Sequence, residues 1–218
     1  MCYYKSEVIA MKTIQKLLNE KYAKNAARFL NVICYFVMAF MLVCLVLAFM
    51  GRQTFSLRTS TGNYESAIYA EENHDHTFRS FTVTSNDNIY VAANDNDQVD
   101  LAVHIGLSLM SVFSILPLTV AYWFLSRVFA NVSKGQLFIE KNARYLLYYG
   151  VIQFFAAFFV PFIKMFICYL TNLVSNSHVS ISTGSDMLNN LIPSIAFIVA
   201  AYIIHYGINL QDEVDHTL

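Results

Sequence analysis

Four long apolar stretches, separated by polar segments, dominate the pattern of the chain. They cover Phe29–Met50, Leu101–Leu125, Leu146–Leu170 and Leu188–Tyr206. Only the third stretch contains a charged residue, Lys164. A helix needs roughly 20 apolar residues to cross about 30 Å of hydrocarbon. The pattern therefore predicts an all-α transmembrane four-helix bundle.

The segment 51–100, between the first two spans, follows a different pattern. β-Branched and aromatic residues are frequent in Ser66–Ala70, Thr77–Thr84 and Asn88–Ala92, and clusters of Asn and Asp separate these stretches. Short runs of this kind are typical of strands joined by turns. We therefore expect a small β-rich extracytoplasmic loop domain there. The later segment 171–187 is polar and short, and is expected to be a simple connection.

Composition and charge exclude several classes of protein. The chain is 56% hydrophobic and 13% charged, whereas an ordinary soluble domain is about 25% charged. Its 14 basic and 15 acidic residues give a net charge of −1, which argues against a protein that binds nucleic acid directly through net charge. Four cysteines in 218 residues are too few for a secreted disulfide scaffold.

The positions of the basic residues predict how the spans are oriented. Ten of the 14 lie in the segments 1–28 and 126–145, whereas the segment 51–100 holds eight acidic residues and no lysine. Segments rich in Lys and Arg stay in the cytoplasm. Both termini, including the acidic tail 207–218, and the connection 126–145 are therefore predicted to be cytoplasmic.

Two features of the N-terminal region leave alternatives open. The first span could be a cleaved signal peptide, but its 22 apolar residues exceed the roughly 7–15 of a signal peptide and no A-x-A site follows. An anchor is therefore expected. The basic segment 1–28 serves either to set the topology or to lie on the anionic surface of the lipid bilayer.

Polar side chains within or at the ends of the spans are candidates for transport, because burying such groups is costly. No Asp or Glu occurs inside any span, which argues against a coupled pump. A small transporter, or a transporter subunit, with spans bent at proline is the alternative function. The polar candidates are His104, Gln153, Lys164 and His205, and the prolines are Pro117, Pro161 and Pro193.

No catalytic residue, cofactor site or metal site is predicted. The chain lacks G-x-S-x-G, H-E-x-x-H, P-loop and C-x-x-C motifs, so a membrane-bound enzyme is the least favoured function. The histidines of His74-Asp75-His76 would share one face of a strand, as imidazole ligands of a metal can. Because no third ligand is evident, a solvated loop is the favoured interpretation.

Two cytoplasmic stretches carry more specific patterns. The connection Asn131–Asn142 (NVSKGQLFIEKN) contains G-x-x-F-x-x-x-N, and the chain closes with Leu210–Leu218 (LQDEVDHTL). Together with four spans, these stretches resemble a bacterial family of small four-helix integral membrane proteins of unknown function. The resemblance covers about Leu101–Leu218 and hardly touches the segment 51–100. The residues that match are Gly135, Phe138, Asn142, Leu210, Gln211, Asp212, Glu213, Asp215 and Thr217.

This resemblance implies a non-enzymatic regulatory role in the bacterial cytoplasmic (inner) membrane. Members of the family resemble membrane partners of small cytoplasmic helix-turn-helix transcription regulators, often encoded beside them. Such a regulator is therefore the expected partner. A homo-oligomer is a further expectation, because the chain has only four spans.

The residue types in the connection 126–145 predict its local structure independently of the resemblance. Ser133 is expected to cap a helix that begins near Lys134, and Gly135 to allow close backbone approach. Phe138 is expected to enter the membrane interface, and Asn142 to bond a neighbouring backbone. The acidic tail would face the basic side chains of the connection, and the two would form either a plain helix elbow or a docking platform. Those basic residues are Arg127, Lys134, Lys141 and Arg144.

Overall fold

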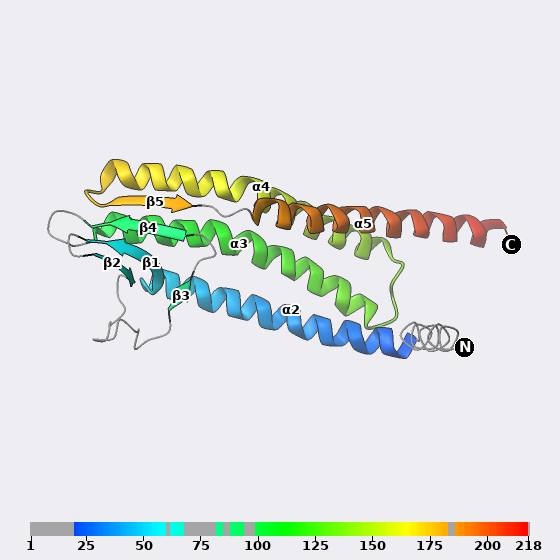
Figure 1. Cartoon of the computed structure of the whole chain (residues 1–218). Coiled ribbons are helices and arrows are strands. Elements are labelled where there is room, and N and C mark those ends of the chain that lie inside the picture. The colour runs from blue at the N-terminus through cyan, green and yellow to red at the C-terminus, as the bar shows by residue number, and fades with distance from the viewer. Residues whose placement is uncertain are drawn as a thin grey trace, which may run out of the picture. The chain divides into compact units, whose positions relative to one another are not determined.

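Four long helices and a small sheet make up the described part of the chain (Figure 1). The computed structural model describes residues 20–59, 62–67, 82–84, 88–93, 99–182 and 186–217. Each helix is long and apolar enough to cross a membrane, which confirms the predicted count of candidate spans. The helices are α2 (Glu20–Phe49), α3 (Leu101–Val132), α4 (Glu140–Val174) and α5 (Asp186–Thr217).

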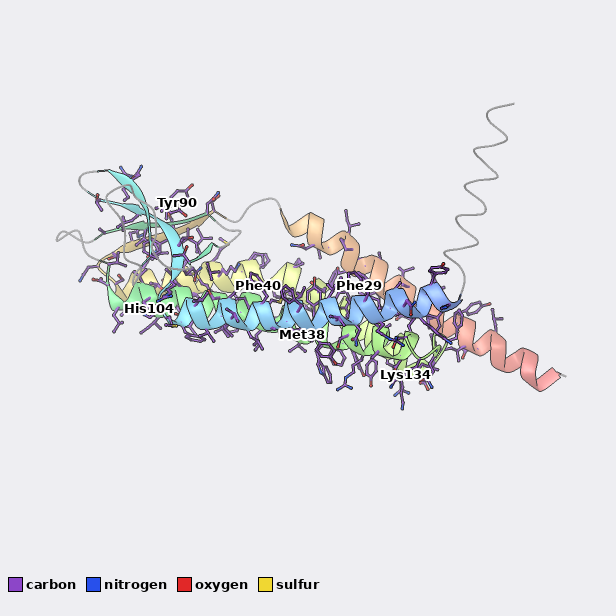
Figure 2. All side chains as sticks on the ribbon, turned by 90° about the horizontal axis from the view of Figure 1, so that it is seen from below. Phe29, Met38, Phe40, Tyr90, His104 and Lys134 are labelled. Carbon is purple, nitrogen blue, oxygen red and sulfur yellow. The ribbon has the colours of Figure 1, made fainter. Side chains whose placement is uncertain are left out.

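Large apolar side chains are exposed along all four helices. Figure 2 labels two of them on α2, Phe29 and Phe40, whose exposed fractions are 66% and 61%. A helix that is apolar on its outer surface is typical of a membrane span rather than of a surface helix of a soluble protein.

The chain divides into two compact units. The helical unit contains the described residues 20–38, 120–151 and 196–217. The sheet unit contains the described residues between 39 and 119 and between 152 and 195. Each unit holds part of every helix, and the strands belong to the sheet unit.

The sheet joins strands from two separate connections. Its order is β2-β1-β4-β5, and β3 pairs with β1. β4 is parallel to β1 and antiparallel to β5, so that Tyr90 lies between Ser56 and Ser180 in the register. The strands are β1 (Gln53–Arg58), β2 (Asn63–Ser66), β3 (Val83–Thr84), β4 (Asn88–Ala92) and β5 (His178–Ser182).

The small sheet confirms the predicted β-rich loop, but three of its strands differ from expectation. β2 covers Asn63–Ser66 and meets the predicted stretch Ser66–Ala70 only at Ser66. β1 directly follows α2, where no strand was predicted. β5 lies in the segment 171–187, so the prediction of a simple connection there is wrong. Its alternating Val179 and Ile181 bury against the sheet core, which explains why so short a polar segment forms a strand. The predicted loop His74-Asp75-His76 lies outside the described residues.

One face of the sheet packs on α3 and α4, beside the strands in Figure 1. Alternate side chains of each strand point to the same face, so the other face carries Ser56, Tyr90 and Ser180, which are exposed. Figure 2 labels Tyr90 among them. The buried cluster is a single apolar layer between strands and helices. Its members are Phe55, Ile89, Val91, Val103, Leu107, Met110, Ile167 and Val179.

Asn172 on α4 covers the outer edge of β5. Its side-chain amide donates to the main-chain oxygen of Val179 at 2.8 Å, and its side-chain oxygen accepts from Val179 N–H at 2.7 Å. Unpaired edge groups invite association with other strands. The helix therefore replaces a neighbouring strand at this position.

Asp100 ties the start of α3 to the segment after α4. Its carboxylate accepts hydrogen bonds from Ser175 Oγ at 2.9 Å, from Asn176 N–H at 2.6 Å and from Ser177 N–H at 3.2 Å. Asp100 also precedes the first residue of α3, and its carbonyl accepts from Val103 N–H. An acidic residue at a helix start is stabilised by the helix dipole. The two connections of the sheet unit are thus held together by a side chain as well as by strand pairing.

Candidate functional site

The connection between α3 and α4 is built from a specific helix ending. Gly135 has φ of 84°, the left-handed conformation that glycine adopts at low cost. Its N–H donates to Val132 O at 2.9 Å, and Gln136 N–H donates to Asn131 O at 3.1 Å. This pair of hydrogen bonds is the Schellman motif, which satisfies the last carbonyls of a helix. The chain therefore turns out of α3 in one defined direction.

Asn142, the third residue of α4, holds the connection from its other side. Its side chain is fully buried. Its Nδ2 donates to Gln136 O at 2.6 Å and to Leu137 O at 2.9 Å, while its Oδ1 accepts from Asn131 Nδ2 at 2.8 Å. One side chain thus joins the end of α3, the connection and the start of α4. The prediction that Asn142 bonds a neighbouring backbone is confirmed.

The residues held by this network point outward. Lys134, Gly135, Gln136, Leu137 and Phe138 are all exposed, and Figure 2 labels Lys134 among them. A buried polar network fixes the position of its members more firmly than apolar contacts do. The connection therefore presents a short apolar and basic surface in a fixed conformation.

Phe138 also contacts α5. A Cβ atom at Gly207 would lie 3.7 Å from Cδ1 and Cε1 of the Phe138 ring, an ordinary van der Waals separation. The ring remains 55% exposed, so it packs on one face and leaves the other free. The α3–α4 connection and the last third of α5 are thus neighbours within the helical unit.

The basic residues of the region differ in their surroundings. Arg127 lies over the Trp123 ring, with its Cζ 5.0 Å from the ring centre, in a cation–π contact. Arg144 donates from Nε to Glu140 Oε1 at 3.1 Å, a surface pair that contributes little to stability. Lys134 and Lys141 are exposed.

Two details of the predicted connection are wrong. Ser133 does not begin a helix: it follows the last residue of α3, and its hydroxyl donates back to Ala130 O at 2.8 Å. Gly135 serves the positive φ of the helix ending rather than close backbone approach. Asn131, the partner of Asn142, had no predicted role, although an asparagine on each side of Gly135 was a signal for such a pair.

The acidic tail forms the last turns of α5, which continues to Thr217. Leu210 is exposed. The side chains of Gln211, Asp212, Glu213 and Asp215 lie outside the described residues, so their pairing with the basic connection stays a prediction.

The four polar candidates for transport have different surroundings. His104 Nε2 is 3.0 Å from Phe49 O, where it caps the end of α2, and Figure 2 shows its position on α3. Gln153 and Lys164 share α4 but lie about 16 Å apart at the helical rise. His205 is exposed on α5.

Within the described part of the chain, no group of three His, Cys, Asp or Glu side chains is placed to hold a metal ion. Comparison with protein-family models, with curated proteins and with solved structures finds no match. The resemblance of residues 101–218 to a bacterial membrane-protein family therefore stays a prediction from its two motifs.

Proposed function

We propose that this chain is a multi-pass protein of the bacterial cytoplasmic membrane that docks a cytoplasmic regulator, with the α3–α4 connection as its binding surface. On three of its helices, a span of about 20 residues begins at an exposed arginine. Arg28, Arg127 and Arg144 are exposed on α2, α3 and α4 and are proposed to mark the basic end of each span. A span needs about 20 residues. Counted from these three arginines, the spans end at Ala48 on α2, Leu107 on α3 and Lys164 on α4.

At the other end of these spans, within the sheet unit, α2 and α3 are in contact. Ser108 Oγ donates to Ala48 O at 3.4 Å, so α2 and α3 meet at this level. Beyond it, Val103 packs against the sheet. An open sheet with polar edges is not stable in hydrocarbon. The sheet and the helix ends beneath it therefore lie outside the bilayer.

The charge distribution supports an orientation of the chain across the membrane. The connection between α3 and α4 is basic, and the segment that holds β1 to β4 is acidic and free of lysine. On the positive-inside rule the connection faces the cytoplasm and the sheet faces outward. A cytoplasmic partner therefore meets the connection and both chain ends.

The observation that carries the docking role is the Asn142 network. A fully buried side chain with three hydrogen bonds holds an exposed segment that contains Lys134, Leu137 and Phe138. A plain elbow needs no such network. The surface fits a partner with an apolar pocket and acidic side chains around it, and a small helix-turn-helix regulator is the expected partner.

Photo-crosslinking in living cells tests this function. A photoreactive residue at Phe138 is expected to capture a cytoplasmic protein, because the ring is exposed at the centre of the surface. The double variant Lys134→Glu and Lys141→Glu is expected to abolish that adduct. The same probe at Val120, an exposed position on α3 within the proposed span, is the control and is expected to capture no cytoplasmic protein. Adducts at Phe138 that contain only lipid or a second copy would contradict the proposal.

A further inference from the structure

A second exposed surface runs along α4 and is distinct from the connection. Its residues follow one another at intervals of four and three, the a and d spacing of a heptad repeat. Their exposed fractions lie between 47% and 64%. We call this surface the α4 seam, and it consists of Phe155, Phe159, Phe162, Phe166, Tyr169 and Leu173.

The seam faces away from the rest of the sheet unit. Ile163 and Ile167, which lie about a quarter to a third of a helical turn from the seam centre, pack into the core beneath the sheet. Thr171 is buried on the same side. The sheet therefore covers one face of α4 and leaves the seam open. Within the seam, Phe155 and Phe159 stack with ring centres 5.6 Å apart.

Half of the seam lies beyond the proposed membrane boundary. The proposed span of α4 ends at Lys164, short of the end at Leu170 predicted from the apolar run, because Ile167 packs against the sheet. Phe166, Tyr169 and Leu173 follow Lys164. Lipid can cover Phe155 to Phe162, but it cannot cover the outer half. Contiguous apolar surface in water marks an interaction site. This step rests on the membrane depth argued under the proposed function.

We propose that a second copy of this chain covers the seam, with α4 against α4 in parallel. Two copies in one membrane point the same way, so a two-fold axis along the membrane normal places each seam residue opposite its own counterpart. A heptad seam suits that arrangement, because a and d residues meet in layers between parallel helices.

The area of the seam is sufficient for a stable dimer. Large aromatic side chains bury about 150–250 Å² each, and those of the seam are about half exposed. The five aromatic residues and Leu173 together offer on the order of 600 Å² per copy and about 1,200 Å² in total, above the roughly 1,000 Å² that a specific interface needs.

Disulfide crosslinking in native membranes tests the dimer. The starting chain has Cys2, Cys34 and Cys44 replaced by alanine and Cys168 by serine, which keeps the hydrogen-bond donor to Val179 O. Single cysteines are then placed at two seam positions, Tyr169→Cys and Leu173→Cys. Matched controls are Met165→Cys and Val174→Cys, which are also exposed but lie to either side of the seam.

The seam positions are expected to give a disulfide-linked dimer in several-fold higher yield than the controls, because only residues on the axis come within disulfide distance. Equal yield at all four positions, or no dimer at any, would overturn the proposal. So would crosslinks to a different protein. Alkaline extraction of the same membranes distinguishes failure of the membrane assignment from failure of the dimer. Release of the chain from the membrane would contradict the membrane assignment and would leave the dimer to be judged from the crosslinks.

A charged variant gives a second measurement. Leu173→Glu lies outside the proposed span and is expected to insert normally but to run as a monomer in lipid nanodiscs, where the unaltered chain runs as a dimer. An unaltered chain that is monomeric there, or an inserted Leu173→Glu chain that stays dimeric, would refute the α4 seam as a dimer interface.

Discussion

Gly106 on α3 and Thr171 on α4 lie in direct contact within the sheet unit. A Cβ atom at Gly106 would overlap the Thr171 hydroxyl and would lie 3.2 Å from its Cγ2 and 3.3 Å from its Cβ. Thr171 is buried, and its hydroxyl donates to Ile167 O at 2.9 Å, so it has little room to move. The absence of a side chain at Gly106 therefore sets how closely these two helices approach.

The Gly106→Ala variant is expected to lose about 1–3 kcal/mol of unfolding free energy, because the added methyl forces the helices apart. The measurement is unfolding of the purified protein in detergent. Thr171→Ala in the same chain removes the overlapping atoms and is expected to restore part of the loss. Simple addition of the two single effects would contradict a direct contact.

The Asn142→Asp variant tests the polar network of the connection. A carboxylate cannot donate to the carbonyls of Gln136 and Leu137, and it would lie buried against their oxygens. The loss of two hydrogen bonds and the burial of a charge are expected to lower the unfolding free energy by about 3 kcal/mol or more. Asn209→Asp, at an exposed asparagine on α5, is the matched control and is expected to change stability by less than about 0.5 kcal/mol.

Substitutions of Gly135 distinguish backbone strain from a steric side-chain contact as the cause of a stability loss. Gly135→Ala is expected to cost about 1–2 kcal/mol, since alanine is strained at a φ of 84°. Gly135→Asn is expected to cost less, because asparagine tolerates that region and also occurs at helix ends. Thermal unfolding in detergent would show the order Gly, Asn, Ala. Equal losses for both variants would point to a steric contact instead of backbone strain.

The Asn172→Ala variant tests protection of the sheet edge. Without this side chain, Val179 N–H loses its hydrogen-bond partner and Val179 O keeps only the Cys168 thiol at 3.1 Å. Amide exchange at Val179 and its neighbours in β5 is therefore expected to become faster. Hydrogen exchange followed by mass spectrometry measures this. Asn176→Ala is the control, because Asn176 contributes its main-chain N–H to Asp100 and its side chain is exposed. Unchanged exchange in β5 would mean that Asn172 does not protect the edge.

The helices were predictable from apolar runs, and their ends were not. Apolar length identifies a candidate span, but it does not locate the helix ends. α3 continues beyond Leu125 to Val132, and α4 begins before Leu146, at Glu140. Hydrogen bonds, not the end of the apolar run, fix these two ends. Those bonds come from the glycine turn at Gly135 and from Asn142. The local pattern G-x-x-F-x-x-x-N therefore located the connection correctly while the role of Ser133 was misread.

The sheet was predictable only in part, for a different reason. β4 lies in a run with the alternation of a strand, and it was predicted at its observed position. β5 has two apolar residues, Val179 and Ile181, and its strand form depends on pairing with a segment about 90 residues earlier. Such long-range pairing leaves little trace in a short polar sequence.

The origin of β5 in the second connection has a consequence for biosynthesis. As the chain leaves the ribosome, β4 emerges without one of its neighbours, and both α3 and α4 must be made before β5 follows. The sheet thus closes late, after most of the polypeptide has been translated, and distant pairing of this kind is slow. Nascent chains stalled before residue 178 would carry an unpaired edge of β4. A chaperone or a protease would bind the chain at this stage of synthesis.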